Sequence, residues 1–225
     1  MTLKPLSRLA TPLLVLLKLQ IVLLVIAVIF DITQVYLFQQ ASEGVDVVES
    51  LESVLFGNGI VALVQVAFFV ITGIIFLRWK YRANKNLREL STQEFEYTPG
   101  WAVGAYFVPL ANLVMPYRAM KEIWTAAHRQ EEEQTRFLGL WWGAWIISGT
   151  LGQLSFRINQ GADDLESYTY AAAADFASDG FDILLTLIAI VLVSRITTAY
   201  QENYADVGGQ DCERTDEFAD DAPGF

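Results

Sequence analysis

The stretch that decides the fold is GNGIVALVQVAFFVITGIIFL, residues 57–77. It contains no charged residue, and the basic and aromatic run Arg78–Arg82 follows it directly. A helix needs about 20 mostly apolar residues to cross the hydrocarbon core of a bilayer, so this stretch predicts a membrane-spanning helix. We therefore interpret the chain as an integral membrane protein.

Three further apolar stretches lead to the prediction of an all-α membrane protein with four transmembrane helices. The fourth of them is the weakest, because Asp182 and Arg195 flank a short apolar core. The first is far longer than the roughly 7–15-residue apolar core of a signal peptide, so we expect it to be retained. The predicted spans are about 13–38, 57–77, 137–156 and 181–200.

The composition supports this class of protein and excludes others. Hydrophobic residues make up 53% of the chain and charged residues 18%, whereas soluble domains carry about 25% charge. A formal charge of −11 argues against nucleic-acid binding, which needs a basic surface. With Cys212 and His128 as its only cysteine and histidine, the chain has neither an internal disulfide nor a Cys/His metal site. Because P-loop, GxGxxG and HExxH motifs are absent from the sequence, we expect neither an enzyme nor a bound cofactor.

The distribution of charge predicts the orientation in the membrane. Most basic residues lie before the first span or in the connection between the second and third spans, 78–136. The two shorter connections are acidic, and Arg157 is their one basic residue. By the positive-inside rule, both termini and the middle connection are cytoplasmic, and the acidic connections lie outside the cell membrane.

The middle connection is predicted to hold two interfacial helices and a segment between them. Residues 78–90 place apolar residues at helical spacing among basic ones, which predicts a helix along the cytoplasmic interface. Residues 101–115 lack charge but contain Gly104 and Pro109, so they predict a segment that is either re-entrant or interfacial. A second interfacial helix starts at Pro116, and its apolar face would consist of Tyr117, Met120, Trp124 and Ala127.

The C-terminal residues differ in composition from the rest. Residues 1–200 are predicted to form the membrane domain, and residues 201–225 are acidic with Arg214 as their only base. Such a composition predicts a disordered acidic tail. The acidic bias also fits a high-salt environment, which the sequence does not decide.

Several motifs occur in an order that can be recognised. They include YRANKNL at 81–87, TPGWAVG at 98–104 and FVPLANL at 107–113, followed by Pro116-Tyr117 and Glu122-Ile123-Trp124. GLWW at 139–142, Trp145 and SFR at 155–157 extend the pattern. The ordered set resembles the prokaryotic integral-membrane family catalogued as domain of unknown function 4328. This resemblance implies the four-span architecture and no activity, because the family is itself uncharacterised.

The distinctive residues of the middle connection are candidates for binding lipid or a partner protein. Its basic cluster either enforces topology or binds anionic headgroups, each basic residue contributing about 1 kcal/mol near a charged leaflet. Asn112 either satisfies carbonyl groups freed by the chain break or faces a ligand. Arg157 either pairs with an outer aspartate or binds a lipid phosphate. The candidates are Arg78, Lys80, Arg82, Asn84, Lys85, Asn86, Arg88, Asn112, Tyr117, Glu122, Trp124 and Arg157.

Charged and small residues in the predicted spans suggest further roles. Lys18, Asp31 and Asp182 are intramembrane charged residues, which point to function by default, although a structural role is favoured for Lys18 and Asp31. Lys18 can extend its stem to the headgroups. The small-residue pairs Gly139/Gly143 and Ser148/Gly152 predict close packing of the third span, within the chain or in a homo-oligomer.

The leading hypothesis is a non-enzymatic membrane module that binds membrane lipids or a partner protein through its cytoplasmic middle connection. The alternative is an oligomeric small transporter or channel, with Asp31, Gln65, Thr72 and Asp182 as lining residues. A membrane enzyme ranks third, because the spans hold no paired carboxylates that suggest a reaction. The sequence names no ligand, partner or oligomeric state.

Overall fold

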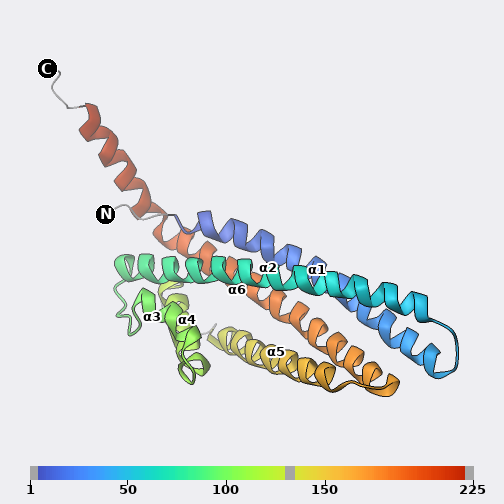
Figure 1. Cartoon of the computed structure of the whole chain (residues 1–225). Coiled ribbons are helices and arrows are strands. Elements are labelled where there is room, and N and C mark those ends of the chain that lie inside the picture. The colour runs from blue at the N-terminus through green and yellow to red at the C-terminus, as the bar shows by residue number, and fades with distance from the viewer. Residues whose placement is uncertain (1–4, 130–134, 221–225) are drawn as a thin grey trace. The chain divides into compact units, whose positions relative to one another are not determined.

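The computed structural model describes residues 5–129 and 135–220, and side chains up to residue 204 except that of residue 135. Every regular element in this part of the chain is a helix, so the prediction of an all-helical protein is confirmed there. The long helices are α1 (Ser7–Ser42), α2 (Val48–Leu90), α5 (Thr135–Gly161) and α6 (Leu165–Asp220) (Figure 1). Between α2 and α5 lie α3 (Pro99–Gly104), two short 3₁₀ helices (Ala105–Phe107 and Ala111–Leu113) and α4 (Met115–Ala127).

Three of the described helices are long and apolar enough to cross a membrane: α1, α2 and the part of α6 over Leu165–Tyr204. They contain three of the predicted spans, including the one over 181–200. Helix α5 contains the predicted span 137–156, but Trp141, Trp142 and Trp145 stand there with glycine, serine and glutamine. These residues are less apolar than the leucine, valine and isoleucine of the other helices. The count of four spans therefore stays a prediction.

The chain divides into two compact units, and each is described separately. Unit 1 comprises Met1–Pro12, Ile75–Leu138 and Leu192–Phe225, and unit 2 comprises Leu13–Ile74 and Gly139–Val191. Helix α6 continues to Asp220. The predicted disorder of 201–225 remains a prediction, because residues 221–225 and the side chains from 205 onwards lie outside the described part.

Unit 2 brings α1, α2, α5 and α6 together. A Cβ atom on Gly57 of α2 would lie 2.8 Å from the ring of Phe30 on α1, so a glycine permits the close approach of these two helices. At the far end of α1, Phe38 stacks on Tyr168 of α6 with ring centroids 6.0 Å apart. Hydrogen bonds between serines of α5 and aspartates of α6 join the remaining pair.

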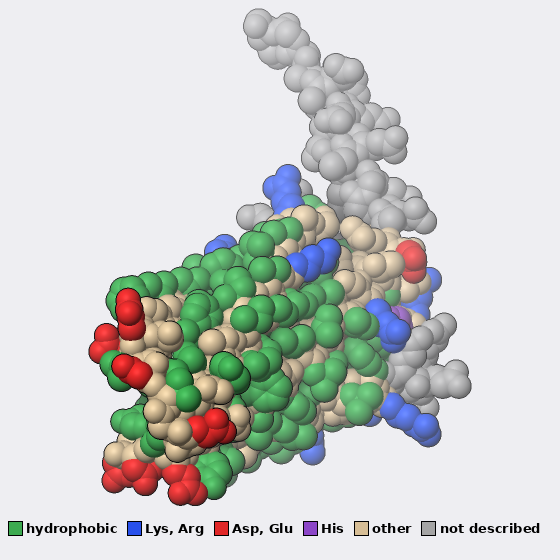
Figure 2. Space-filling view, turned by 90° about the vertical axis from the view of Figure 1, so that its right-hand side faces the viewer, with side chains coloured by type: hydrophobic (Ala, Val, Ile, Leu, Met, Phe, Trp, Pro, Cys, Tyr) green, Lys and Arg blue, Asp and Glu red, His purple; other side chains and the backbone are tan. Residues whose placement is uncertain are grey.

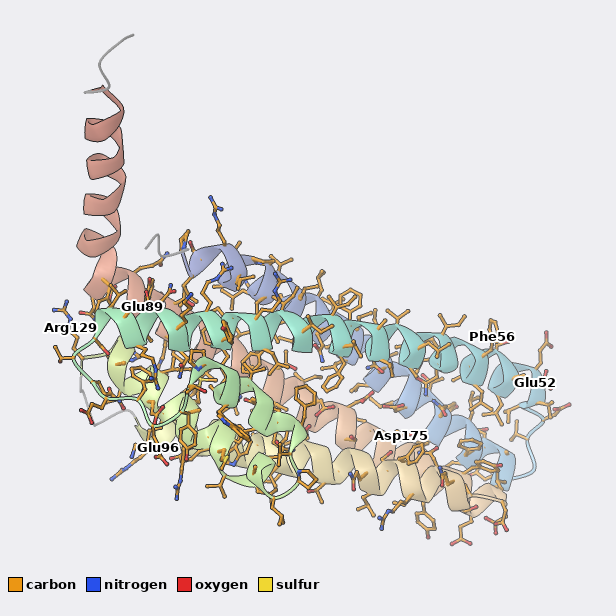
Figure 3. The ribbon with its side chains drawn as sticks, turned by 60° about the vertical axis from the view of Figure 1, so that its left-hand side comes forward. Glu52, Phe56, Glu89, Glu96, Arg129 and Asp175 are labelled. Atoms are coloured by element: carbon orange, nitrogen blue, oxygen red, sulfur yellow. The ribbon has the colours of Figure 1, made fainter. Side chains whose placement is uncertain are left out.

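The surface of unit 2 matches a lipid environment. The α1–α2 and α5–α6 connections lie at the same end of the unit, where acidic side chains gather (Figure 2). Beyond the acidic residues large hydrophobic side chains face outward. The first of them on α2 include Phe56, which lies one turn after Glu52, is 73% exposed and points away from the helices (Figure 3). Apolar side chains on the outside of long helices lose nothing in a bilayer, whereas water would disfavour them. The exposed acidic residues are Glu43, Asp46, Glu49, Glu52, Asp163, Asp164 and Glu166.

In unit 1 the basic segment 78–90 differs from its prediction. It is not a separate interfacial helix but the C-terminal part of α2, which runs unbroken from Val48 to Leu90. Neither proline nor glycine occurs after Gly73 in this helix, so no residue stops or bends it at the predicted boundary.

Helix α4 also differs from the predicted second interfacial helix. The ring of Trp124 lies 5.9 Å from that of Phe137 at the start of α5, and Tyr204 of α6 donates a hydrogen bond to the Ala126 carbonyl at 2.9 Å. The apolar face of α4 therefore packs on protein, because α5 and α6 supply the apolar cover that lipid was expected to provide. The buried residues of α4 are Pro116, Ala119, Met120, Ile123, Trp124, Ala126 and Ala127.

Candidate functional site

Three polar side chains, two of them from the recognised motifs, hold the connection from α2 to α3 against α2 and α4. The Asn84 amide donates to the Tyr97 carbonyl at 3.4 Å, and the Arg88 guanidinium donates to the carbonyls of Phe95 and Tyr97 at 2.8 and 3.2 Å. From α4, the Glu122 carboxylate accepts the backbone N–H groups of Glu96 and Tyr97 at 2.9 and 3.4 Å. Both sides of residues 95–97 are thus fastened, one to α2 and the other to α4.

Glu122 is half-buried in this arrangement. Burial raises the pKa of its carboxyl group, and the two N–H donors only partly oppose that effect. Because its two oxygen atoms accept backbone N–H groups, this carboxyl group has a structural role.

Lys80 fastens the next part of the connection. Its side chain is fully buried, and its Nζ atom donates to the Tyr106 hydroxyl at 3.2 Å and to the Pro116 carbonyl at 2.9 Å. The Nζ atom also lies 4.6 Å from the centroid of the Tyr106 ring, within cation–π range. Burial raises the pKa of the Tyr106 hydroxyl, which keeps this acceptor neutral. One lysine thus holds the segment between α3 and α4 against α2.

Trp79 and the motif residue Asn86 join α2 to α6. The Trp79 indole donates to the Thr197 hydroxyl at 3.3 Å, and the Asn86 amide donates to the Tyr200 hydroxyl at 3.0 Å. On α4, the ring of Trp124 stacks on His128 at 4.3 Å. Trp79, Asn86 and Trp124 are all buried. These side chains build the interior of unit 1 and are not available to a ligand on its surface.

The structure thus separates the predicted lipid- or partner-binding residues by exposure. Arg78, Lys85, Arg88 and Arg157 are exposed, although Arg88 is engaged with backbone carbonyls. The half-buried candidates are Arg82, Asn112, Tyr117 and Glu122, and the buried ones are Lys80, Asn84, Asn86 and Trp124.

Residues 101–115 were predicted to be re-entrant or interfacial, but none of their apolar side chains was named as a candidate binding residue. Trp101, Phe107 and Leu110 are 55%, 74% and 82% exposed, and Leu110 has a φ of 66°, a left-handed conformation that is rare for leucine. Val108, Leu113 and Val114 are exposed beside them. We call this set of six residues the apolar tip. Its inner side is the part that Lys80 holds to α2.

A second region, in unit 2, is a polar cavity of about 350 Å³. It brings together Asp31 and Gln65, two of the predicted transporter residues, whereas Thr72 and Asp182 are not part of its lining. Asp182 instead accepts a hydrogen bond from Ser148. The cavity is lined by Asp31 of α1; Asn58, Ala62 and Gln65 of α2; Gly152, Ser155, Phe156 and Asn159 of α5; and Asp175, Ser178 and Asp179 of α6.

The carboxylates of this cavity are bonded unequally. Asp175, labelled in Figure 3, accepts hydrogen bonds from Ser155 and from the Asn159 amide, the latter at 2.9 and 3.1 Å to its two oxygens. Asp31 is only 1% exposed, and its Oδ2 atom has no hydrogen-bond partner. Within the described residues, no group of three or more His, Cys, Asp or Glu side chains is close enough to hold a metal ion.

Asp175 and Asp179 fall between the predicted spans 137–156 and 181–200, in an acidic connection that was expected to lie outside the membrane. They lie instead on α6, which begins at Leu165 and so extends the predicted span by several turns. The signal that could have revealed them is their spacing of four residues, which places both on one helix face. The loop aspartate Asp164 has a different role at the start of α6. Hydrogen bonds from the Ser167 side chain and from the Ser167 N–H, the latter at 2.8 Å, lower the pKa of the Asp164 carboxyl group.

The two predicted small-residue pairs of α5 differ in whether they pack against another helix of the chain. A Cβ atom on Gly152 would lie 3.8 Å from the Ser178 hydroxyl of α6, so the Ser148/Gly152 pair packs within the chain. A Cβ atom on Gly139 or Gly143 would meet nothing within 4 Å.

Comparison with known proteins identifies a family for the greater part of the chain. The model of the family described as Domain of unknown function (DUF4328) matches residues 52–198, which include the motif residues of α2 and α4. No curated protein and no solved structure matches the chain.

Proposed function

The chain belongs to the family described as Domain of unknown function (DUF4328), and we propose that it is a non-enzymatic, four-span membrane module that binds anionic lipid on the cytoplasmic side. In this proposal α5 crosses the bilayer with α1, α2 and α6. Both termini and the connection 78–136 then face the cytoplasm, and the acidic connections of unit 2 face outside. The charge distribution supports this orientation, because basic residues near span ends favour the cytoplasmic side.

The observation that carries the proposal is the apolar tip of unit 1. Six exposed apolar side chains within residues 101–114 would be unfavourable in water but favourable in the boundary between headgroups and acyl chains. The segment is made of short helical turns, so we propose that it lies in the interface or dips into one leaflet without crossing it.

The exposed basic residues of unit 1 would attract an anionic membrane surface. Arg78 and Lys85 on α2 and Arg118 and Lys121 on α4 are exposed. Each basic residue near an anionic leaflet contributes about 1 kcal/mol to the attraction. An apolar surface that inserts and cations that meet phosphate together favour an anionic membrane surface over a protein partner.

The depth of the apolar tip tests the proposal. In a Cys212→Ser background, Leu110→Cys is labelled with bimane, and the protein is reconstituted in phosphatidylglycerol nanodiscs that contain nitroxide lipids. We expect the lipids to quench this label and aqueous iodide to leave it bright. The matched control is Glu94→Cys, an exposed site in the same connection, where iodide should quench. A Leu110 label quenched only by iodide would refute insertion.

Lipid choice is tested by native mass spectrometry from mixed phosphatidylglycerol and phosphatidylcholine. We expect the double variant Arg78→Gln, Lys85→Gln to retain less phosphatidylglycerol than the parent protein. Substitution of Asn84, Asn86 or Glu122 would not serve this purpose, because these side chains hold unit 1 together. Unchanged phosphatidylglycerol retention in the double variant would remove the basic residues from the proposal.

A second candidate function, an oligomeric small transporter or channel, is favoured by the polar cavity of unit 2. The open space beside Gly139 and Gly143 would admit a second copy of α5, as the predicted homo-oligomer requires.

A further inference from the structure

The polar cavity of unit 2 has an unusual charge balance. Three carboxylates line it, those of Asp31, Asp175 and Asp179, and no basic side chain does. Lys18 and Arg157 are the basic residues of unit 2; both are exposed on helix surfaces, and neither is part of the lining. A buried carboxylate needs a counter-charge or hydrogen bonds. The basic side chains of unit 2 provide no counter-charge inside this cavity, so a bound ligand would have to supply it.

Asp31 indicates where a positively charged ligand group would bind. This residue lines the cavity, it is only 1% exposed, and its Oδ2 atom has no hydrogen-bond partner. Asp175, in contrast, is already bonded by Ser155 and Asn159. Buried polar atoms in folded proteins are almost always satisfied, so an orphan carboxylate oxygen that faces a cavity indicates a ligand atom.

The cavity lies within the helical bundle of unit 2, away from its acidic end. Asp31 stands eleven residues before Ser42, the end of α1, and Asp175 ten residues after Leu165, the start of α6. At 1.5 Å per residue, both lie about 15 Å along their helices from the connections. The two carboxylates therefore occupy a similar level of the bundle, and a single ligand can meet both.

The volume and the spacing of the carboxylates select the class of ligand. A cavity of about 350 Å³ falls in the range of small-molecule sites and is far larger than a bare metal ion requires. The acidic side chains are also too dispersed to form a metal cluster among the described residues. We propose that this cavity binds a small organic cation, such as a substituted ammonium or guanidinium, with Asp31 as its principal counter-charge.

Calorimetry on the full-length protein in mild detergent tests this site. The probes are choline and methylguanidinium, and the comparison ligand is 3,3-dimethylbutan-1-ol, the neutral carbon analogue of choline. We expect at least one of the two cations to bind and the neutral analogue to give no heat. In Asp31→Asn the affinity should fall at least about tenfold, because the main charge partner is lost.

Two controls keep the result interpretable. Glu52→Gln removes an exposed carboxylate of the same unit outside the cavity, so it should leave the affinity unchanged. If Asp31→Asn fails to fold, Asp179→Asn serves in its place, with the same expected direction. The site is overturned if neither cation binds the folded protein, if the neutral analogue binds equally well, if Asp31→Asn and Asp179→Asn both bind like the parent, or if sodium chloride alone gives the Asp31-dependent heat.

Discussion

Units 1 and 2 both bury polar side chains, but Lys80, Asn86 and Glu122 of unit 1 differ from Asp31 of unit 2 in their hydrogen bonding. In unit 1, Lys80, Asn86 and Glu122 have partners that are backbone groups or side chains of the same unit. In unit 2, Asp31 faces a cavity with one oxygen unpartnered. The difference teaches that motif residues such as Asn86 and Glu122 maintain structure, whereas the strongest sign of a ligand is Asp31, a residue outside the motifs.

The largest effect is expected where a buried donor of unit 1 is removed. Lys80→Met keeps much of the side-chain volume but removes the hydrogen bonds that Lys80 donates to the Tyr106 hydroxyl and to the Pro116 carbonyl. We expect the free energy of unfolding to fall by about 3 kcal/mol, measured by denaturant unfolding in detergent. The control Lys85→Met alters an exposed side chain of the same helix and should change it by less than about 0.5 kcal/mol. Equal effects of the two variants would contradict a structural role for Lys80.

In unit 2, substitution of a buried polar residue should raise the stability of the protein instead of lowering it. Asp31→Asn replaces a buried carboxyl group, whose Oδ2 atom has no hydrogen-bond partner, with a neutral amide, so we expect the ligand-free protein to become more stable, by about 1 kcal/mol. Thermal unfolding in detergent measures this difference. The contrast with Lys80→Met is the sharpest test of the two uses of buried polar groups. A clear loss of stability in Asp31→Asn would mean that Asp31 has a structural role like that of Lys80.

The smallest expected effect is the contribution of Glu122 to the pH dependence of protein stability. Because burial raises the pKa of this carboxyl group, the folded state holds its proton more tightly than the unfolded state does. Its contribution to stability is then fully present below the unfolded pKa and is lost as the pH rises through the folded pKa. We expect the stability of Glu122→Gln, relative to the parent, to increase from pH 4 to pH 8. A relative stability that is flat over this range, followed by thermal unfolding, would show that the two N–H donors offset burial completely.

The sequence predicts much of the fold because the relevant signals are local. Apolar runs of sufficient length mark α1, α2 and α6, and the ordered motifs identify the family that the family model confirms. Helix boundaries were less accurate. The basic segment after Leu77 was separated from α2, although nothing in the backbone interrupts it, because the change in composition was taken for a change in structure.

The candidate sites were predicted less well, and the reason is physical. Asn84 and Glu122 were singled out as binding residues, but their partners lie 13 and 26 positions away in the sequence, and only folding brings them there. Asp31 and Gln65 were proposed as lining residues without their companions, because Asp175 and Asp179 were read as loop residues.

The sequence by itself determined the class of the protein, its apolar helices, the segregation of its charge and its family, since each depends on composition or on spacing along one segment. Tertiary structure alone decided which polar residues are consumed by internal contacts and which remain open. It placed Lys80 under the segment that carries the apolar tip, and it placed Asp31 beside a cavity shared by four helices. Which helix faces meet depends on packing between residues far apart in the chain, and the period of a single helix does not contain that information.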